Sequence, residues 1–458
     1  MLSVIEIAPK AIEHKNIIWS PPGDKSISQR TTILSSLANG PCKVRGLLWS
    51  EDTVNNMRIL NELGVKFTII DQDEIVIHGR GLNGFKDVPE VINVGNSATS
   101  ARLFLSTLTG QQRSFIIDGN PVLRSRSMKW VVTPLQEMGA NISYIGEDGF
   151  LPLKVEKSKL IGKTHVAQVS SAQFVSALLY AGLYASNGVE IIRKVKARDH
   201  TERLFNHFGI SICEKGNVVK VVEPKSIEPK NVIVPGDFSS AAMALTLVVI
   251  NKNPGITMRI NSVGLNPTRI GFLKVIEQMG ANIRIENTKN NCGEPLGDII
   301  VESGSQLRGI KISGDEFVQS LIDEIPLICV MAAFAEGETE IRNIEELRDK
   351  DTNRGETIAK LLDQVGIKTL LAKDRITVFP GPLKSLPSID VPKDHRITMA
   401  AMALASQFSK KTTIKGWEVT RVSFPSIINL LDIFVQVKCN QPFFQWGPHL
   451  INKEGISK

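Results

Sequence analysis

The chain has 458 residues, of which 42% are hydrophobic and 22% charged, and its formal net charge at pH 7 is +7. This length and composition indicate a globular protein with room for two or three domains. The basic residues are scattered rather than gathered in a run, which argues against a nucleic-acid partner and favours anionic small-molecule ligands.

The five cysteines are widely spaced and show no metal-ligand or CxxC pattern, so neither a disulfide framework nor structural zinc is expected. The N-terminal segment lacks the apolar core of a signal peptide. No apolar run reaches the ~18 residues that a membrane crossing needs. We therefore expect a cytoplasmic protein without a membrane partner.

The first predicted helix follows the turn in "SPPGDKSISQRTTILSSLANG", residues 20–40, and carries Lys25 and Arg30 near its start. A helix N-terminus has a partial positive charge and unpaired N–H groups, so cations there are unfavourable unless an anion lies nearby. The turn therefore indicates a phosphate or carboxylate site. The alternative is a helix start capped by Asp24 or Ser26, with both cations solvated.

An apolar helical segment that ends at a glycine and precedes a β-branched strand recurs along the chain. The glycines are Gly64, Gly139, Gly209, Gly280 and Gly366. Glycine is the preferred residue just after a helix. The alternation predicts an α/β (α+β) fold built from a repeated unit, with a degenerate sixth copy near "IINLLDIFVQVKC".

The segments "PPGDKSIS" and "VPGDFSSAAMALTLV" share Pro-Gly-Asp, one variable residue and Ser before an apolar helix. The chain thus visits the same local structure twice, and each visit marks a crossing between domains. We predict an inserted domain over residues 25–235 and a discontinuous domain formed by residues 1–24 and 236–458.

Further helix starts carry small, polar or charged residues. "NVGNSATSARLFLSTL" offers free backbone N–H groups with Arg102 one turn later, and "VSSAQFVSALLYAGL" places Ser171 and Gln173 in the same position. In "KARDHTERLFNHFG" Arg198 precedes an Asp or Thr cap. Each of these is also compatible with a capped helix and a surface cation.

The later segments carry further charged residues of both signs. "DGNPVLRSRSMKW" holds Arg126 in a loop, where an anion contact and a solvated side chain are equally compatible. Asp323 and Glu324 directly precede an apolar helix, as a cap or as a partly desolvated general base. "EELRDKDTNRGETIAKLL" mixes both charges at a helix start, and "PKDHRITMAAMALA" places His395 and Arg396 at the mouth of another.

The segments "PGDKSIS", "GNSATSARL", "VSSAQFVSALLYAGL", "RDHTERL", "VPGDFSSAA", "VGLNPTRIG", "IDEIP", "LRDKDTNR" and "KDHRITMA" follow one another over residues 5–425. In this order they resemble the 5-enolpyruvylshikimate 3-phosphate synthase family, and the "SAQ" and "GNSAT" variants resemble its glyphosate-insensitive branch. The resemblance implies a two-domain inverted α/β barrel of six βαβαββ units, three in each domain, with a substrate cleft between the domains.

The same resemblance implies an enzyme of the shikimate pathway, which leads to chorismate and the aromatic amino acids. Such an enzyme transfers the enolpyruvyl group of phosphoenolpyruvate to the 5-hydroxyl of shikimate 3-phosphate and releases phosphate. It needs no metal and no organic cofactor. The expected partners are these two small molecules, and the expected state is a monomer.

Site residues follow from the resemblance position by position. Shikimate 3-phosphate is expected at Lys25, Ser26, Arg30, Ser171, Ala172, Gln173, Arg198, Asp323 and Lys350. Phosphoenolpyruvate is expected at Lys25, Ala98, Arg126, Gln173, Arg354, Arg396 and Arg421. The expected catalytic residues are Lys25, Asp323 as acceptor of the hydroxyl proton, and Asp351.

Several positions depart from the family pattern. Asp351 stands where a glutamate is expected to help proton transfer, and Asn353 stands where an aspartate is expected. Gln29 replaces a histidine, Ser127 a proline and Ala197 a common serine, while Arg421 next to Val422 stands near an expected lysine.

These departures leave two alternatives to a working transferase. One is a catalytically impaired homologue that binds phosphorylated ligands, and the other is an enolpyruvyl transferase with another acceptor. The methyl group of Ala98, where sensitive members carry glycine, predicts weak inhibition by glyphosate.

Overall fold

The computed structural model describes residues 3–12, 14–88, 91–167, 171–440, 447 and 450. The described residues form two compact units, and each is treated by itself below. The first unit contains residues 3–22, 235–290 and 295–440. The second contains residues 23–234 and 291–294, with 447 and 450. The domain limits predicted from the sequence, residues 25–235 and residues 1–24 with 236–458, stay a prediction.

The second unit contains three four-stranded sheets. Their strands, in sheet order, are β14 (Val232–Ile233), β3 (Pro41–Arg45), β5 (Glu74–His78) and β4 (Lys66–Ile69); β6 (Ile92–Asn93), β7 (Phe115–Asp118), β9 (Leu153–Glu156) and β8 (Asn141–Tyr144); and β10 (Thr164–Val166), β11 (Val189–Ile192), β13 (Val218–Val221) and β12 (Ile212–Lys215).

Three more four-stranded sheets have nearly all of their residues in the first unit. They are β2 (Asn16–Trp19), β15 (Thr257–Gly264), β17 (Glu294–Glu302) and β16 (Asn282–Asn291); β18 (Lys311–Ile312), β19 (Thr339–Arg342), β21 (Arg375–Val378) and β20 (Thr369–Leu371); and β22 (Ser388–Asp390), β23 (Thr412–Lys415), β1 (Val4–Pro9) and β24 (Val435–Cys439).

One pairing pattern is common to all six sheets. An edge strand pairs in parallel with its neighbour, as β14 does with β3 and β22 with β23. The neighbour then pairs in antiparallel fashion with the third strand, as β3 does with β5 and β23 with β1. The repeated unit and the mixed α/β fold class predicted from the sequence are confirmed.

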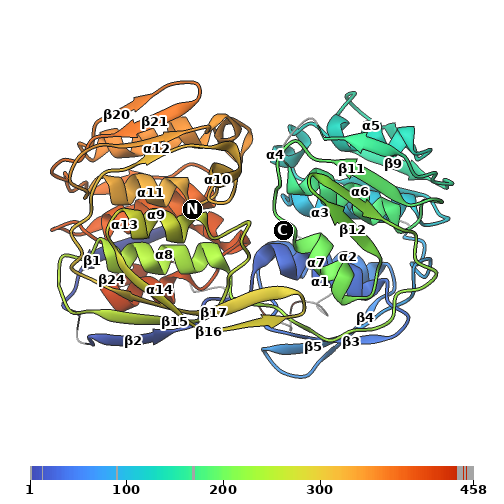
Figure 1. Cartoon of the computed structure of the whole chain (residues 1–458), viewed down its shortest axis with the longest axis horizontal. Helices are drawn as coiled ribbons and strands as arrows, with labels where there is room; N and C mark the ends of the chain where they lie inside the picture. The colour runs from blue at the N-terminus through green and yellow to red at the C-terminus, as the bar shows by residue number, and fades with distance from the viewer. Residues whose placement is uncertain are drawn as a thin grey trace. The chain divides into compact units, whose positions relative to one another are not determined.

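The sixth copy is complete rather than degenerate, which corrects the sequence interpretation. Its sheet takes its third strand from the opposite end of the chain, because β1 pairs with both β23 and β24. In Figure 1 the blue strand β1 accordingly lies beside the red strand β24. The local sequence looks incomplete because part of the copy is contributed by residues 4–9.

Helices alternate with these strands along the chain. In the second unit they are α1 (Lys25–Ser36), α2 (Glu51–Glu62), α3 (Ala98–Thr109), α4 (Pro121–Arg124), α5 (Lys129–Glu137), α6 (Ala172–Gly182) and α7 (His200–His207). In the first unit they are α8 (Phe238–Val249), α9 (Gly271–Gln278), α10 (Asp315–Gln319), α11 (Ile325–Ala332), α12 (Arg354–Gln364), α13 (His395–Ala405) and α14 (Ile427–Phe434), with 3-10 turns η1 (Glu345–Asp349) and η2 (Trp417–Val422).

Each unit has its own hydrophobic core around apolar helices. Every residue of α8 is buried, and α8, α11 and α13 pack against one another in the first unit. In the second unit α3 packs against α6 and α1. A helix that is apolar all round has to lie inside a domain, so the starts of these helices position polar residues at the border of each core.

The five glycines predicted to end helices all have positive φ angles: Gly64 (+91°), Gly139 (+98°), Gly209 (+77°), Gly280 (+100°) and Gly366 (+84°). A residue with a Cβ atom is strained in this left-handed conformation, so glycine is favoured there. The prediction of helix ends at these positions is confirmed. Among the described residues, no helix is long and apolar enough to span a membrane.

Candidate functional site

Lys25 is the first residue of α1, and its charge is balanced inside the second unit. Asp24 caps the helix, since its side chain accepts a hydrogen bond from the Ile27 amide at 2.9 Å. Lys25 Nζ lies 2.6 Å from Asp52 Oδ2 of α2. The sequence alone had pointed to an anionic ligand for this cation; the structure shows that Asp52 is an anion already present there, and Ser26 is half-buried beside it.

Arg30 lies one turn later and is almost fully buried. Its guanidinium donates hydrogen bonds to the Thr201 hydroxyl at 2.8 Å, the Ser176 hydroxyl at 2.9 Å and the Ser26 carbonyl at 2.9 Å. Burial lowers the pKa of Arg30. These contacts join α1 to α6 and α7, so Arg30 braces the region in which its role as a substrate ligand was predicted.

The start of α3 forms a second polar cluster. Ser97 caps the helix, and Ala98 is its first residue and is buried. Gln173 of α6 donates a hydrogen bond to the Thr99 hydroxyl at 3.1 Å and accepts one from Arg102. Ala98 and Gln173, which were predicted as neighbours in one binding site, are therefore brought together through Thr99.

Arg102 gives this cluster its electrostatic character. Its guanidinium carbon lies 4.3 Å from the centroid of the Trp130 ring. Burial, together with the positive charge of Arg126, lowers the pKa of Arg102 to about 9. Two cations that disfavour each other's charge bind an anion readily, because the anion relieves their repulsion.

The start of α7 differs from the prediction of an Asp or Thr cap. Asp199 occupies the N-cap position, but its side chain forms no cap hydrogen bond and instead pairs with Arg203 at 2.8 Å. The Thr201 hydroxyl accepts a hydrogen bond from Arg30. Arg198, predicted as a phosphate ligand, is half-buried and its charge acts on Arg30, while Ser171 and Ala172 are half-buried at the start of α6.

In the first unit, Arg354 is the centre of a carboxylate cluster. It begins α12, it is 3% exposed, and each of its three nitrogens faces a different carboxylate. Nε lies 2.9 Å from Asp394, Nη1 3.0 Å from Asp323 and Nη2 3.5 Å from Asp351. Burial opposes the charge, but the three carboxylates together raise the pKa of Arg354.

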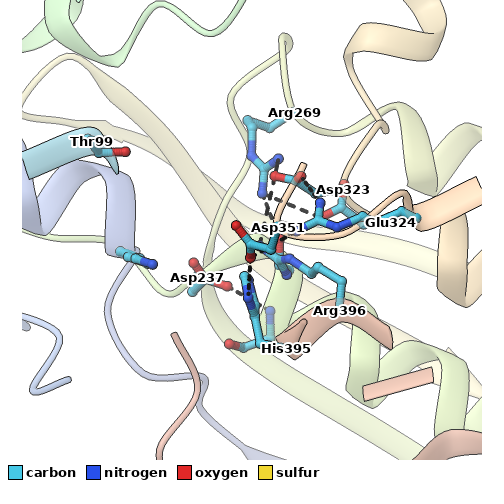
Figure 2. A network of polar contacts seen from close by, with 12 residues as sticks. Thr99, Asp237, Arg269, Asp323, Glu324, Asp351, His395 and Arg396 are labelled. Carbon is cyan, nitrogen blue, oxygen red and sulfur yellow. Dashed lines mark hydrogen bonds and ion pairs between the residues drawn. The ribbon is translucent and has the colours of Figure 1, made fainter. Parts of the chain in front are cut away.

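Asp323 in turn lies among three guanidinium groups (Figure 2). Its nearest nitrogens are Arg354 Nη1 at 3.0 Å, Arg269 Nη1 at 3.6 Å and Arg396 Nη2 at 3.9 Å. Glu324 occupies the N-cap position of α11 without a side-chain cap hydrogen bond. A cap by the Glu324 side chain is therefore wrong, and the general base stays a prediction.

Asp351 and His395 form the next pair in the same cluster. Asp351 Oδ2 lies 3.2 Å from His395 Nδ1, as a dashed line in Figure 2 shows. Burial lowers the pKa of His395, and the nearby carboxylate of Asp351 opposes that change. Asn353 caps α12 by accepting a hydrogen bond from the Glu356 amide at 3.4 Å, so this departure from the family pattern preserves a helix cap.

Lys350 and Arg421 each contact a residue outside the carboxylate cluster around Arg354. Lys350 Nζ is 3.9 Å from Glu346 Oε2. Arg421 lies over the Trp417 ring at 5.7 Å, and no contact in the described part of the chain joins it to Asp323 or Arg354. Its predicted role toward phosphoenolpyruvate therefore has less structural support than those of Arg354 and Arg396.

Candidate metal ligands also occur in this cluster. Ligand atoms of Asp351, Asp394 and His395 lie within 4.8 Å of one another. Both carboxylates already contact Arg354, whose positive charge disfavours a cation at the same place. Asp351 and Asp394 are therefore counter-charges of Arg354, and the cluster fits an ion-pair network better than a metal centre.

Sequence reasoning missed Asp52, Asp394 and Arg269 as members of these clusters. Asp394 is fully buried, caps α13 through the Arg396 amide at 2.9 Å and holds Arg354. Its position just before an apolar helix was a cap signal. Arg269 is present in the motif "VGLNPTRIG", but only the folded chain brings it to Asp323.

Comparisons with known proteins agree with the geometry. The sequence profile of the EPSP synthase (3-phosphoshikimate 1-carboxyvinyltransferase) family matches residues 14–431. The 3-phosphoshikimate 1-carboxyvinyltransferase of Thermodesulfovibrio yellowstonii is 37% identical over 90% of this chain and 96% of its own length. That of Synechococcus sp. is 40% identical over 90% and 93%, respectively.

Solved structures show the same likeness. The EPSP synthase from Acinetobacter baumannii superposes with a TM-score of 0.86 at 31% identity, covering 96% of this chain and all of its own. The match covers residues of both units, so both share the fold of that enzyme.

Proposed function

The chain belongs to the EPSP synthase family, and from this premise we propose how its residues carry the family's reaction. The chain is an enolpyruvyl transferase that moves the enolpyruvyl group of phosphoenolpyruvate to the 5-hydroxyl of shikimate 3-phosphate. The finer assignments below, of residues and of inhibitor response, are the proposal.

Shikimate 3-phosphate is assigned to the polar residues of the second unit around α1, α6 and α7. Its anionic groups pair with Lys25 and Arg198 and with the hydroxyls of Ser26 and Ser171. Arg30 acts largely by bracing this region, because three of its hydrogen bonds are already made within the protein. Asp323 and Lys350 serve the 5-hydroxyl.

Phosphoenolpyruvate is assigned to Arg354, Arg396, Arg126 and Gln173, with Ala98 against it and Lys25 and Arg421 as further cations. A carboxylate and a phosphate brought into one site repel each other strongly, so cations with fixed geometry are required. The observation that supports this assignment is that Asp323, an anion of the protein, already lies among three arginines.

Catalysis follows from the same arrangement. Asp323 accepts the proton of the 5-hydroxyl, and Asp351, paired with His395, assists proton transfer at C3 of the enol. Cations around the substrates stabilise the charge that develops while the enolpyruvyl group is transferred and phosphate leaves.

The test measures phosphate release from shikimate 3-phosphate and phosphoenolpyruvate by the purified protein. We expect turnover by the wild type and a loss of at least about 100-fold in Asp323→Asn, as is typical when a general base is removed. Asp298→Asn, which removes a carboxylate that pairs with Arg259 on a sheet, is the matched control and should keep activity.

Binding of both ligands without phosphate release would instead support an impaired homologue. Turnover only with a different acceptor would support an enolpyruvyl transferase with another acceptor. In the same assay glyphosate should inhibit weakly, because the Ala98 methyl group shortens the space for the longer molecule more than for phosphoenolpyruvate. Submicromolar inhibition competitive with phosphoenolpyruvate would contradict that part of the proposal.

A further inference from the structure

The three arginines around Asp323 are held in different ways. Arg269 is anchored from behind: its Nη2 donates to the Ser239 hydroxyl at 2.8 Å and lies 3.4 Å from Glu324 Oε1. Ser239 in turn donates to the same Glu324 oxygen at 2.5 Å. Arg269 is 4% exposed and Glu324 is 1% exposed, so this trio is a buried support behind Asp323.

Arg396 is anchored less firmly. Its side chain is 13% exposed, and its Nε is buried without a hydrogen-bond partner among the described residues. Arg354 keeps Asp394 through Nε while Nη1 faces Asp323. An incoming carboxylate can therefore take Arg396 and the Nη1 group of Arg354 without disturbing the contact with Asp394.

The two oxygens of Asp323 are divided between these arginines. Oδ1 accepts from Arg354 Nη1, whereas Oδ2 faces Arg269 and Arg396. When a substrate carboxylate occupies Arg354 and Arg396, Oδ1 loses the contact with Arg354, whereas Oδ2 keeps the ion pair with Arg269 at 3.6 Å. Figure 2 shows Arg269 and Arg396 approaching Asp323 from different directions.

We propose that Arg269 is the positioning residue of Asp323. The substrate carboxylate first displaces Asp323 from Arg354 and Arg396. Arg269 then holds Oδ2 in place, so that Oδ1 receives the proton of the acceptor's hydroxyl group. In this step the O–H bond of the hydroxyl breaks and an O–H bond forms on Asp323. The inference rests on the proposed function, which assigns Arg354 and Arg396 to phosphoenolpyruvate.

Glu324 supplies the second counter-charge of Arg269. Once Asp323 carries a proton it no longer balances Arg269, and a buried cation without a counter-charge is unfavourable. Glu324 remains beside Arg269 and keeps the guanidinium in place through the reaction. Its Oε2 is buried without a hydrogen-bond partner among the described residues, which is consistent with a carboxylate retained for charge balance.

The experiment compares Arg269→Gln and Arg269→Lys with the wild type in steady-state kinetics at several pH values. We expect kcat of Arg269→Gln to fall by at least about 10-fold. The KM for phosphoenolpyruvate should stay within about threefold, because Arg269 does not bind that substrate. Arg269→Lys should recover part of the loss.

The pH profile separates positioning from a merely structural role. Without the neighbouring cation, Asp323 protonates at higher pH, so the acid limb of the kcat profile should move upward in Arg269→Gln. Arg354→Gln should instead raise the KM for phosphoenolpyruvate. Arg259→Gln, which removes an arginine paired with Glu286 and Asp298, is the matched control and should change neither quantity.

Arg269→Gln leaves Glu324 buried without a cation, so the double variant with Glu324→Gln is measured beside it to preserve the charge balance. Both variants should show the loss of kcat while unfolding at similar temperatures. A folded variant with unchanged kcat and acid limb, in an active wild-type background, would overturn the inference alone. No phosphate release by the wild type would overturn the proposed function and this inference with it.

Discussion

Gln29 lies buried in α1, and its side-chain amide reaches the start of α3. Nε2 donates to the Ser97 hydroxyl at 2.8 Å and to the Ser100 hydroxyl at 3.1 Å. The Ser100 hydroxyl in turn donates a hydrogen bond to Asn56 Oδ1 at 2.6 Å. These bonds hold the first turn of α3, which begins at Ala98, at a fixed distance from α1, which begins at Lys25.

We expect Gln29→Leu, which keeps the volume but removes the donors, to raise the KM for phosphoenolpyruvate by about 3- to 10-fold, since small displacements of a binding residue are costly. Gln29→His, the residue expected from the family pattern, should restore most of the affinity.

The matched control is Gln111→Leu. Gln111 is equally buried just after the other end of α3, and its amide contacts the Leu82 carbonyl and the Tyr184 hydroxyl. An equal rise in KM for both leucine variants would show a general loss of packing rather than a role of Gln29 at the start of α3.

At the scale of single elements, α13 shows how one side chain serves a helix and a site together. Asp394 caps α13 through Oδ1 and holds Arg354 and Thr352 through Oδ2. The cap satisfies an N–H group that the helix leaves unpaired, and the ion pair orients the arginine at the start of α12. Helix formation and clamp geometry are therefore coupled at one residue.

Asp394→Ala should destabilise the protein by about 3 kcal/mol or more, because it removes the cap and leaves Arg354 with one carboxylate fewer. Asp394→Asn can still accept from the Arg396 amide and should be more stable than the alanine variant by about 1 kcal/mol. Urea unfolding measures both. Equal stability of the two variants would show that the cap contributes nothing.

For the whole molecule, pH acts on stability through buried carboxyl groups. Burial raises the pKa of Glu202 from its ordinary value of 4.5 to about 7, although Arg193 lies 3.4 Å away. Between these values the folded protein binds more protons than the unfolded chain. Its free energy of unfolding therefore decreases as pH rises from about 4.5 to about 7.

Glu202→Gln should remove this contribution, on the order of 3 kcal/mol across the interval. The measurement is the free energy of unfolding at pH 5 and pH 7.5 for both proteins, and the difference between the two pH values should shift toward greater stability at pH 7.5 in the variant. Glu214→Gln, which removes a more exposed partner of Arg193, is the control. An identical pH dependence for wild type and Glu202→Gln would contradict the assignment.

Local patterns determined much of this protein without further help. The five helix-ending glycines, the Asp24 cap, the repeated alternation of helix and strand, and the order of the family motifs were all readable in the sequence. The glycines, the cap and the alternation depend on residues within a few positions of one another, where backbone sterics and capping act. The order of the motifs is a pattern of the linear sequence itself, over residues 5–425. They were enough to predict the fold class, the activity and candidate site residues.

Only the tertiary structure decided which charges meet. Asp52 forms an ion pair with Lys25. The hydroxyls of Thr201 and Ser176 accept hydrogen bonds from Arg30. The tertiary structure also brings β1 from the other end of the chain into the last sheet. Arg269 reaches Asp323 from a different loop. Such pairs are specified by burial: a cation removed from water must find its counter-charge wherever packing brings one, and sequence spacing does not encode that distance.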